Sequence, residues 1–283
     1  MSEKPPSDVP LPYADRPVAT APGHWVLARA GKRVLRPGGA ALTAAMLDHA
    51  RLPGSDVVEL APGLGRTAAE IVAARPASYT AIDRDPQAAA RVAAVVGDRG
   101  VVRQGEAADT GLDDACADVV VGEAMLTMQG DKSKAAIVAE AARVLRPGGR
   151  YAIHELGVAP DDIDEEYYTQ LRRDLARAIH VNARPMTAAA WRGLLEDAGL
   201  VVDWVDTAPM ALLKMSRNLR DEGPGGAARI MWNVMRDKAL RARVMEMRRT
   251  FTRYEKDMVG IALVAHKPEA GARTAPEEAA PGA

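Results

Sequence analysis

The chain has 283 residues, of which 48% are apolar and 27% charged, and its formal net charge is -1. This composition is typical of a globular protein with a sizeable core, either as one enlarged domain or as two. A single cysteine, Cys116, excludes a disulfide framework and a multi-cysteine zinc site. The N-terminus has no apolar segment of signal-peptide length, and no run approaches 18 apolar residues. We therefore expect a cytoplasmic protein that is neither exported nor embedded in a membrane.

Proline marks the first stretch of the chain, because six of the first 22 residues are proline. We expect residues 1–22 to form an extended or disordered arm and residues 271–283 to form a loose tail. Residues 23–270 then make up the folded domain.

Seven short segments between these ends are rich in the β-branched and apolar residues of strands. They alternate with segments of helical periodicity, which predicts an α/β fold with a seven-stranded, mostly parallel, doubly wound sheet. The seven segments are Asp56 to Leu60, Tyr79 to Asp83, Gly100 to Arg103, Asp118 to Gly122, Tyr151 to Glu155, Val201 to Val205 and Gly260 to His266.

Several of the intervening helices carry start or stop signals. Asp85 is the expected N-cap of a helix that begins at Pro86, and Thr187 is the expected N-cap of another. The heptapeptide Arg-Val-Leu-Arg-Pro-Gly-Gly occurs at residues 33–39 and again at residues 143–149. We interpret both copies as helix stops and not as signs of a duplicated domain.

The segment before the last strand is longer than a hairpin needs, which predicts a helical insertion at about residues 206–257. From Lys214 to Asp257 it holds 12 basic and 6 acidic residues, a net charge of +6 that could attract an anionic partner. Gly223-Pro224-Gly225-Gly226 could hinge a lid. Its flexible thioethers and aromatic rings could line an apolar pocket or simply form core: Met210, Met215, Met231, Trp232, Met235, Met245, Met247, Phe251 and Tyr254.

The most specific pattern lies at the first two strands. The first strand carries Glu59 near its end, a turn with Gly63 and Gly65 follows, and the second strand ends at Asp83. Glycines let the backbone approach a ligand closely, and a carboxylate about 20 residues after such a turn can bind ribose hydroxyls. The turn also fits the G-x-G-x-x-[GA] pattern of NAD-dependent oxidoreductases.

Two more features bear on whether this turn binds a dinucleotide or another nucleoside cofactor. Gly105-Glu106-Ala107 follows the third strand, and residues 144–153 form a helix end, a Pro-Gly-Gly turn and a strand. In this order, across roughly residues 55 to 158, the motifs resemble those of the class I S-adenosylmethionine (SAM) dependent methyltransferases, whose fold has seven strands. Ala61 stands where the family's [ED]-x-G-x-G-x-G motif has its first glycine, which predicts a less permissive turn because alanine resists positive φ.

The resemblance implies that SAM binds at the carboxyl ends of the strands and leaves as S-adenosylhomocysteine (SAH), without a metal. Glu59 would face the amino group of SAM, Asp83 the ribose hydroxyls, and Glu106 with Ala107 the adenine. Arg84 could cover the adenine face or be solvated. The full set of cofactor residues implied is Glu59, Ala61, Gly63, Gly65, Asp83, Arg84, Glu106, Ala107 and Glu123.

The acceptor side carries fewer signals. His154 closes the fifth strand and could act as a general base because the pKa of histidine is near neutrality, or it could be an ordinary strand-end residue. The candidate substrate residues are His24, Trp25, Glu155, Tyr167 and Trp232. The aromatic residues Trp25, Tyr167 and Trp232 could instead be ordinary packing.

These patterns favour an enzyme of the EC 2.1.1 class that methylates an O, N, S or C atom of a small molecule by in-line displacement. Three alternatives stay open: RNA or protein methylation through the basic insertion, NAD(P)-dependent oxidation, and SAM binding without catalysis. Nucleic acid is the less favoured partner, because aromatic residues are only 4% of the chain and give little stacking surface. The oligomeric state is open, with a homodimer as one candidate.

Overall fold

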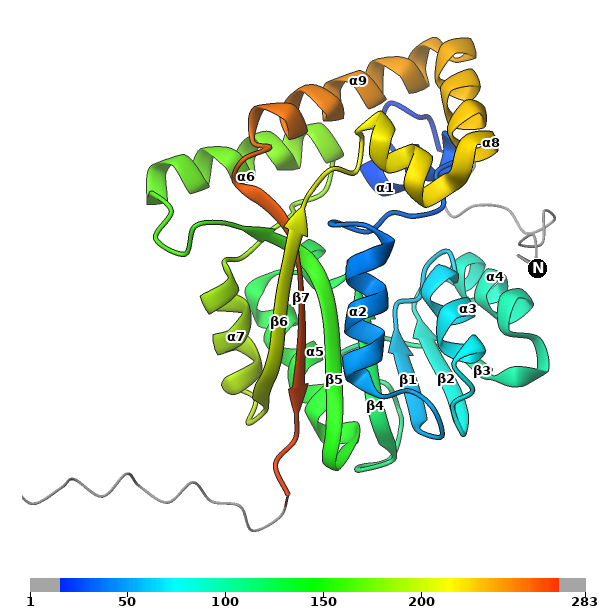
Figure 1. Ribbon diagram of the computed structural model, residues 1–283, viewed down its shortest axis with the longest axis vertical. Coiled ribbons are helices and arrows are strands. Elements are labelled where there is room, and N and C mark those ends of the chain that lie inside the picture. Colours follow the sequence, from blue (N-terminus) through cyan, green and yellow to red (C-terminus); the bar gives the residue numbers. More distant parts are fainter. Residues whose placement is uncertain (1–15, 270–283) are drawn as a thin grey trace, which may run out of the picture.

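Seven strands form one sheet in a computed structural model that describes residues 16–269 (Figure 1). The strand order is β3-β2-β1-β4-β5-β7-β6, and β7 runs antiparallel to its neighbours β5 and β6. This confirms the predicted doubly wound α/β sheet. The expectations for residues 1–15 and for the C-terminal tail lie outside the described residues.

The strands lie where the apolar segments predicted them, with some longer ends. β1 has the predicted bounds, whereas β5 and β6 continue for several residues past the predicted ends. The strands are β1 (Asp56–Leu60), β2 (Ser78–Asp83), β3 (Val101–Gln104), β4 (Ala117–Glu123), β5 (Leu145–Val158), β6 (Val201–Pro209) and β7 (Met258–His266).

Helices fill the connections between the strands, and both predicted N-caps are confirmed. The Asp85 carboxylate accepts hydrogen bonds from the backbone of Gln87 and Ala88, and the Thr187 hydroxyl accepts one from Ala190. The helices are α1 (Gly23–Arg29), α2 (Ala40–Ala50), α3 (Arg66–Ala73), α4 (Pro86–Val96), α5 (Asp131–Val144), α6 (Glu165–Ile179), α7 (Ala188–Glu196), α8 (Met215–Arg236) and α9 (Lys238–Arg253), with short 3-10 turns η1 (Gly97–Arg99) and η2 (Leu126–Met128).

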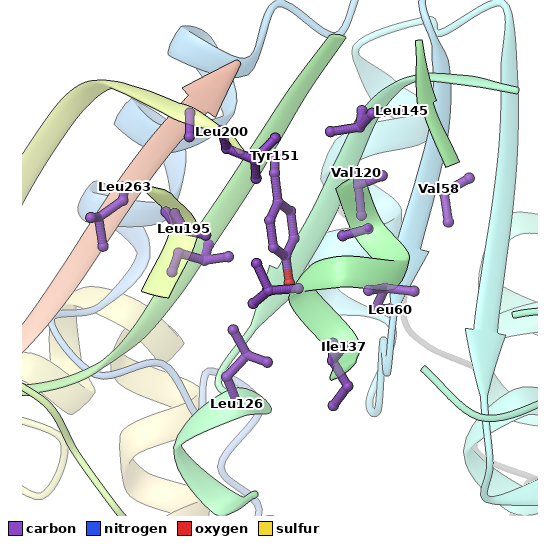
Figure 2. Close-up of a cluster of buried hydrophobic side chains, with 14 of the residues drawn as sticks. Val58, Leu60, Val120, Leu126, Ile137, Leu145, Tyr151, Leu195, Leu200 and Leu263 are labelled. Atoms are coloured by element: carbon purple, nitrogen blue, oxygen red, sulfur yellow. The ribbon is translucent and has the colours of Figure 1, made fainter. Parts of the chain in front are cut away.

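Two hydrophobic clusters cover the two faces of the sheet. Because side chains alternate along a strand, Val57 and Val119 pack against α2, α3 and α4, whereas Val58 and Val120 pack against α5 and α7. Figure 2 shows the second cluster, in which the ring of Tyr151 stands among leucine and valine side chains. The strand tips are thereby held in a fixed arrangement.

The heptapeptide copies do not both act as helix stops. At the second copy α5 ends at Val144 and strand β5 begins at Leu145, earlier than the expected stop at the glycines. The first copy lies between α1 and α2, and its last residue, Gly39, is the N-cap of α2. The same heptapeptide therefore has two different structures. Neither copy forms a complete helix or strand by itself, so its conformation depends on the surrounding chain.

Four helices gather above the carboxyl ends of the parallel strands: α1, α6, α8 and α9 (Figure 1). The expected insertion between β6 and β7 consists of α8 and α9, and α8 is kinked at Gly223, where φ is 71°. None of the helices in residues 16–269 is long and apolar enough to span a bilayer.

Candidate active site

A cavity of about 580 Å³ opens between the strand tips and the overlying helices. Its wall includes eight of the nine residues predicted for the cofactor, and three of the five predicted for the substrate. The cofactor residues on the wall are Glu59, Ala61, Gly63, Asp83, Arg84, Glu106, Ala107 and Glu123, and the substrate residues are His24, Trp25 and Glu155.

The glycine turn after β1 has the left-handed backbone that its sequence suggested. Gly63 has φ 57°, and its N–H donates to the Asp83 carboxylate at 3.1 Å, which ties the turn to the tip of β2. Ala61 has φ 51°, so the alanine adopts a conformation that favours glycine. Gly65 does not line the cavity; it is the left-handed N-cap of α3, and a Cβ there would lie 3.2 Å from Val95 of α4.

Two buried carboxylates at the tips of β1 and β2 both bind protons more readily than exposed ones. Burial raises the pKa of Glu59 to about 8 although Tyr79 donates a hydrogen bond to it at 2.5 Å. Burial also raises the pKa of Asp83, against the effect of the backbone N–H groups of Asp85 and Gly63. These side chains therefore favour a cationic or hydrogen-bond-donating ligand.

Glu123, at the end of β4, lies in a dense polar network. Its carboxylate pairs with Arg36 Nε at 3.0 Å and accepts hydrogen bonds from Thr43 and Thr67. Burial alone would raise the pKa of Glu123, but Arg36 and then His154 outweigh it and lower the pKa to about 2. Glu123 is thus a stable anion in the wall of the cavity.

Arg36 is a cavity residue that the sequence reasoning missed. Its side chain is 4% exposed, and its guanidinium also pairs with Glu70 at 3.2 Å and donates to Thr67 at 2.9 Å. The repeated heptapeptide was the available signal, because Arg36 is the fourth residue of its first copy. A helix stop is therefore the wrong interpretation of this copy, because its fold brings a buried cation to the carboxylates.

His154 is fully buried and does not line the cavity. Its Nδ1 lies 2.7 Å from Glu123 Oε1 and 3.0 Å from Thr43 Oγ1, and its Nε2 contacts the carbonyl oxygen of Pro37. Since both ring nitrogens face oxygen atoms of the protein, neither is free to take a proton from a bound acceptor. This geometry does not support the predicted general base and fits a residue that positions Glu123.

Glu155 lines the cavity, yet the protein itself occupies its carboxylate. Both oxygens accept hydrogen bonds from the backbone of Met125, Leu126 and Thr127, at 2.7 to 3.0 Å, and from the Thr127 hydroxyl at 2.6 Å. Glu155 therefore holds η2 in place, and the expectation that it contacts the substrate directly is not supported.

Two predicted substrate residues lie away from the cavity. Trp232 is 56% exposed on α8, and Tyr167 is 40% exposed with its hydroxyl donating to Asp257 at 2.6 Å. Of the methionines and aromatic residues of the insertion, Met210, Met247 and Phe251 line the cavity. The aromatic and thioether signal was thus a mixture of pocket, core and surface residues, which periodicity alone does not separate.

Known proteins resemble the chain at the level of family and fold. Residues 58–153 match the family described as "Methyltransferase domain". A curated Haemophilus influenzae protein described as "Uncharacterized protein" is 29% identical over 251 residues, which cover 87% of this chain and 98% of that one.

Two solved structures share the fold at low sequence identity. Haemonchus contortus phosphoethanolamine N-methyltransferase 2, in complex with phosphomonomethylethanolamine and SAH, is 14% identical with a TM-score of 0.66, covering 87% of this chain and 58% of that one. The [4+2]-cyclase SpnF is 17% identical with a TM-score of 0.65, covering 94% and 100%. The matched family thus shows that residues 58–153 form a methyltransferase domain of the class I, SAM-dependent kind, and the solved structures show that the chain shares their fold.

Proposed function

We propose that this enzyme transfers the methyl group of SAM to a small molecule held between the strand tips and the overlying helices. The observation that carries the proposal is the set of acidic side chains that line the cavity beside the left-handed glycine turn: Glu59, Asp83 and Glu106. SAM carries an ammonium and a sulfonium cation, which the carboxyl groups beside the turn complement once they are ionised, whereas the pyrophosphate of a dinucleotide at the same turn would meet their repulsion.

Each cofactor residue has a role that its surroundings support. Glu59 is placed to accept hydrogen bonds from the ammonium group, and Asp83, which already orders the turn through Gly63, to accept them from the ribose hydroxyls. Glu106 and Ala107 would contact the adenine and Arg84 would cover it. SAM supplies an activated methyl carbon, so the protein has to orient an acceptor in line with it and exclude water.

His24 replaces His154 as the histidine that we assign to the acceptor. It lies on α1 in the cavity wall, beside Trp25, at 4.9 Å between ring centroids. Burial lowers the pKa of His24 to about 4, so its imidazole is neutral near pH 7 and does not repel the sulfonium. A neutral ring offers one hydrogen-bond acceptor and one donor to the nucleophile.

Calorimetric titration with SAH and with NADH tests the cofactor. We expect one SAH site and no NADH binding, and we expect Asp83→Asn to weaken SAH binding about 10-fold to 100-fold, because roughly 1 to 3 kcal/mol of hydrogen bonding is lost. Asp203→Asn is the matched control, since Asp203 pairs with His266 at the edge of the sheet. NADH binding that SAH displaces, or an SAH affinity untouched by Asp83→Asn, would refute the proposal.

Transfer of label from [methyl-³H]SAM to the small molecules of a deproteinised cell extract tests His24. His24→Phe should lower the transfer rate about 10-fold or more with SAH affinity unchanged, because a lost orienting contact affects catalysis and not cofactor binding. The exposed His49, changed to Phe, serves as the control. Full transfer by His24→Phe would remove this residue from the acceptor site.

A further inference from the structure

The cavity has two chemically different ends, and the order of the strands separates them. The acidic side chains lie at the tips of β1, β2 and β4 and after β3, whereas the other end is formed by β5, the segment after β6, and helices α6 and α9. This second end, here named the apolar chamber, is lined by Leu156, Leu175, Ile179, Leu212, Met247 and Phe251.

The chamber wall continues the hydrophobic core. Leu156, Leu175 and Met247 are buried members of two core clusters, and Ile179, Leu212 and Phe251 are their partly buried neighbours. The partly buried side chains show that the core is open to the cavity here. Met247 and the nearby lining residue Met210 have flexible thioethers that adapt to the shape of an apolar ligand.

Charge is absent from the exposed wall of the chamber. Glu155, the carboxylate at this end, has four hydrogen-bond donors of its own and no spare oxygen for a cationic ligand. The other charged lining residues belong to the opposite end or face solvent. Arg36 pairs there with Glu123, Arg33 and Arg66 are exposed, and the rest are Glu59, Asp83, Arg84, Asp85 and Glu106. An ionised ligand in the chamber would lose its hydration without gaining a partner.

From this arrangement we infer that the methyl acceptor is an uncharged molecule with a largely apolar body, and that this body binds in the apolar chamber. The inference rests on the proposed function, because it assigns the second substrate of the same site. The nucleophilic atom of the acceptor then faces the cofactor end, and the apolar wall keeps water from the reacting methyl group. As the new bond to the methyl carbon forms, the carbon–sulfur bond breaks, its electron pair stays on sulfur to give SAH, and the nucleophilic atom gives up its proton to the neutral imidazole of His24.

Binding of the neutral apolar dye Nile red to the full-length protein saturated with SAH tests the chamber. We expect a one-to-one complex with enhanced emission that SAH does not displace. Leu212→Trp should fill the chamber and weaken the affinity for the dye at least 10-fold. Leu219→Trp, on the exposed face of α8, should leave that affinity unchanged. A second matched pair should show the same contrast in dye affinity, with a loss in Met247→Lys and none in Met245→Lys. Met247 is buried in the wall, whereas Met245 is 41% exposed on the same helix.

Retained SAH affinity shows that each variant is folded. It also separates the test of the chamber by dye binding from the test of the cofactor site by SAH binding. Three results would overturn the inference: displacement of the dye by SAH, full dye affinity in SAH-binding Leu212→Trp, or loss of the dye in Trp232→Ala, which would place it on the outer face of α8. If the protein bound no SAH at all, the proposed function would fail instead.

The labelled product of the extract assay gives an independent readout. An uncharged apolar acceptor yields a product that carries its tritium into octanol when the mixture is partitioned at pH 7. Label that remains in the aqueous phase would contradict the inference while leaving methyl transfer intact.

Discussion

At the scale of single residues, the site depends on carboxylates that differ in charge because their neighbours differ. Glu123 is held as an anion by Arg36 and the groups around it, whereas Glu59 is buried with a neutral tyrosine as its hydrogen-bond partner. Burial raises the pKa of Glu59 to about 8, so the ligand-free protein holds a proton there at neutral pH. The sequence shows two similar glutamates at two strand ends, and only the surroundings distinguish them.

The pKa of Glu59 predicts that cofactor binding releases a proton. An ammonium group beside Glu59 favours the carboxylate, so SAH should bind more tightly as the pH rises from 6 to 7.5. Calorimetry in two buffers of different ionisation enthalpy measures the release, which Glu59→Gln should abolish. Proton uptake in the wild type, or a release that persists in Glu59→Gln, would contradict the assignment.

The same residue predicts a pH dependence of stability without ligand. A carboxyl group whose folded pKa is about 8 and whose ordinary pKa is 4.5 favours folding in its protonated form. Its contribution is complete below about pH 4.5 and is lost as the pH rises toward 8. Urea unfolding should therefore give a lower free energy of unfolding at pH 8 than at pH 5 in the wild type. The difference between the two pH values should be smaller in Glu59→Gln.

The glycine turn gives a prediction of opposite signs at neighbouring positions. Ala61→Gly should stabilise the protein by roughly 0.5 to 1 kcal/mol, because left-handed strain exceeds the entropy that glycine adds to the unfolded chain. Gly63→Ala should destabilise it by about 1 kcal/mol through strain alone, since a Cβ there meets no atom closer than 3.9 Å. Urea unfolding measures both, and equal effects of the same sign would contradict the interpretation.

At the scale of elements, the segment between α1 and α2 is held by parts of the chain that are remote in sequence. The carbonyl of Pro37 accepts from His154, and the carbonyl of Gly38 accepts from Arg217 of α8 at 2.7 Å. Gly260 of β7 lies so close that an added Cβ would overlap the backbone of Pro37 and Gly38. The position of Arg36 in the cavity therefore depends on contacts with β5, β7 and α8.

Gly260→Ala should displace this segment and with it Arg36. We expect a loss of roughly 1 to 3 kcal/mol in unfolding free energy from overpacking, together with weaker SAH binding. Gly193→Ala is the control, because Gly193 lies within α7 with open space at its Cβ and should gain about 0.5 to 1 kcal/mol. Unchanged stability and SAH affinity in Gly260→Ala would show that the segment adjusts without cost.

At the scale of the whole molecule, the basic insertion is largely joined to the rest of the protein. Arg243 donates to the carbonyl of Ala178 at 2.9 Å, Arg253 pairs with Asp174 at 3.3 Å, and Arg217 donates to the carbonyl of Gly38 at 2.7 Å. Basic residues thus serve in part to attach α9 to α6 and α8 to the segment that follows α1. This reduces the charge that a nucleic acid would meet.

We therefore expect only weak, non-specific binding of RNA. A 20-nucleotide RNA should bind with a Kd no tighter than about 10 μM near physiological salt, in the range of non-specific electrostatic association. Fluorescence anisotropy measures this, with the double variant Arg248→Gln and Arg249→Gln as a probe of the exposed basic face. Binding below 1 μM that falls steeply with salt and with these substitutions would favour RNA as the acceptor.

The sequence by itself determined the sheet, the glycine turn and most of the carboxylates that line the cavity beside it, because these follow from local patterns: strand periodicity, helix caps, and glycines before a carboxylate. Only the tertiary structure decided the partners of Glu123 and His154 and the place of Arg36. It also decided which side chains of the insertion line the chamber and which are exposed on the surface. Arg36 and Glu123 are 87 residues apart, and Pro37 and His154 are 117 apart. Such contacts arise when the packed sheet brings distant segments together, and no local periodicity encodes them.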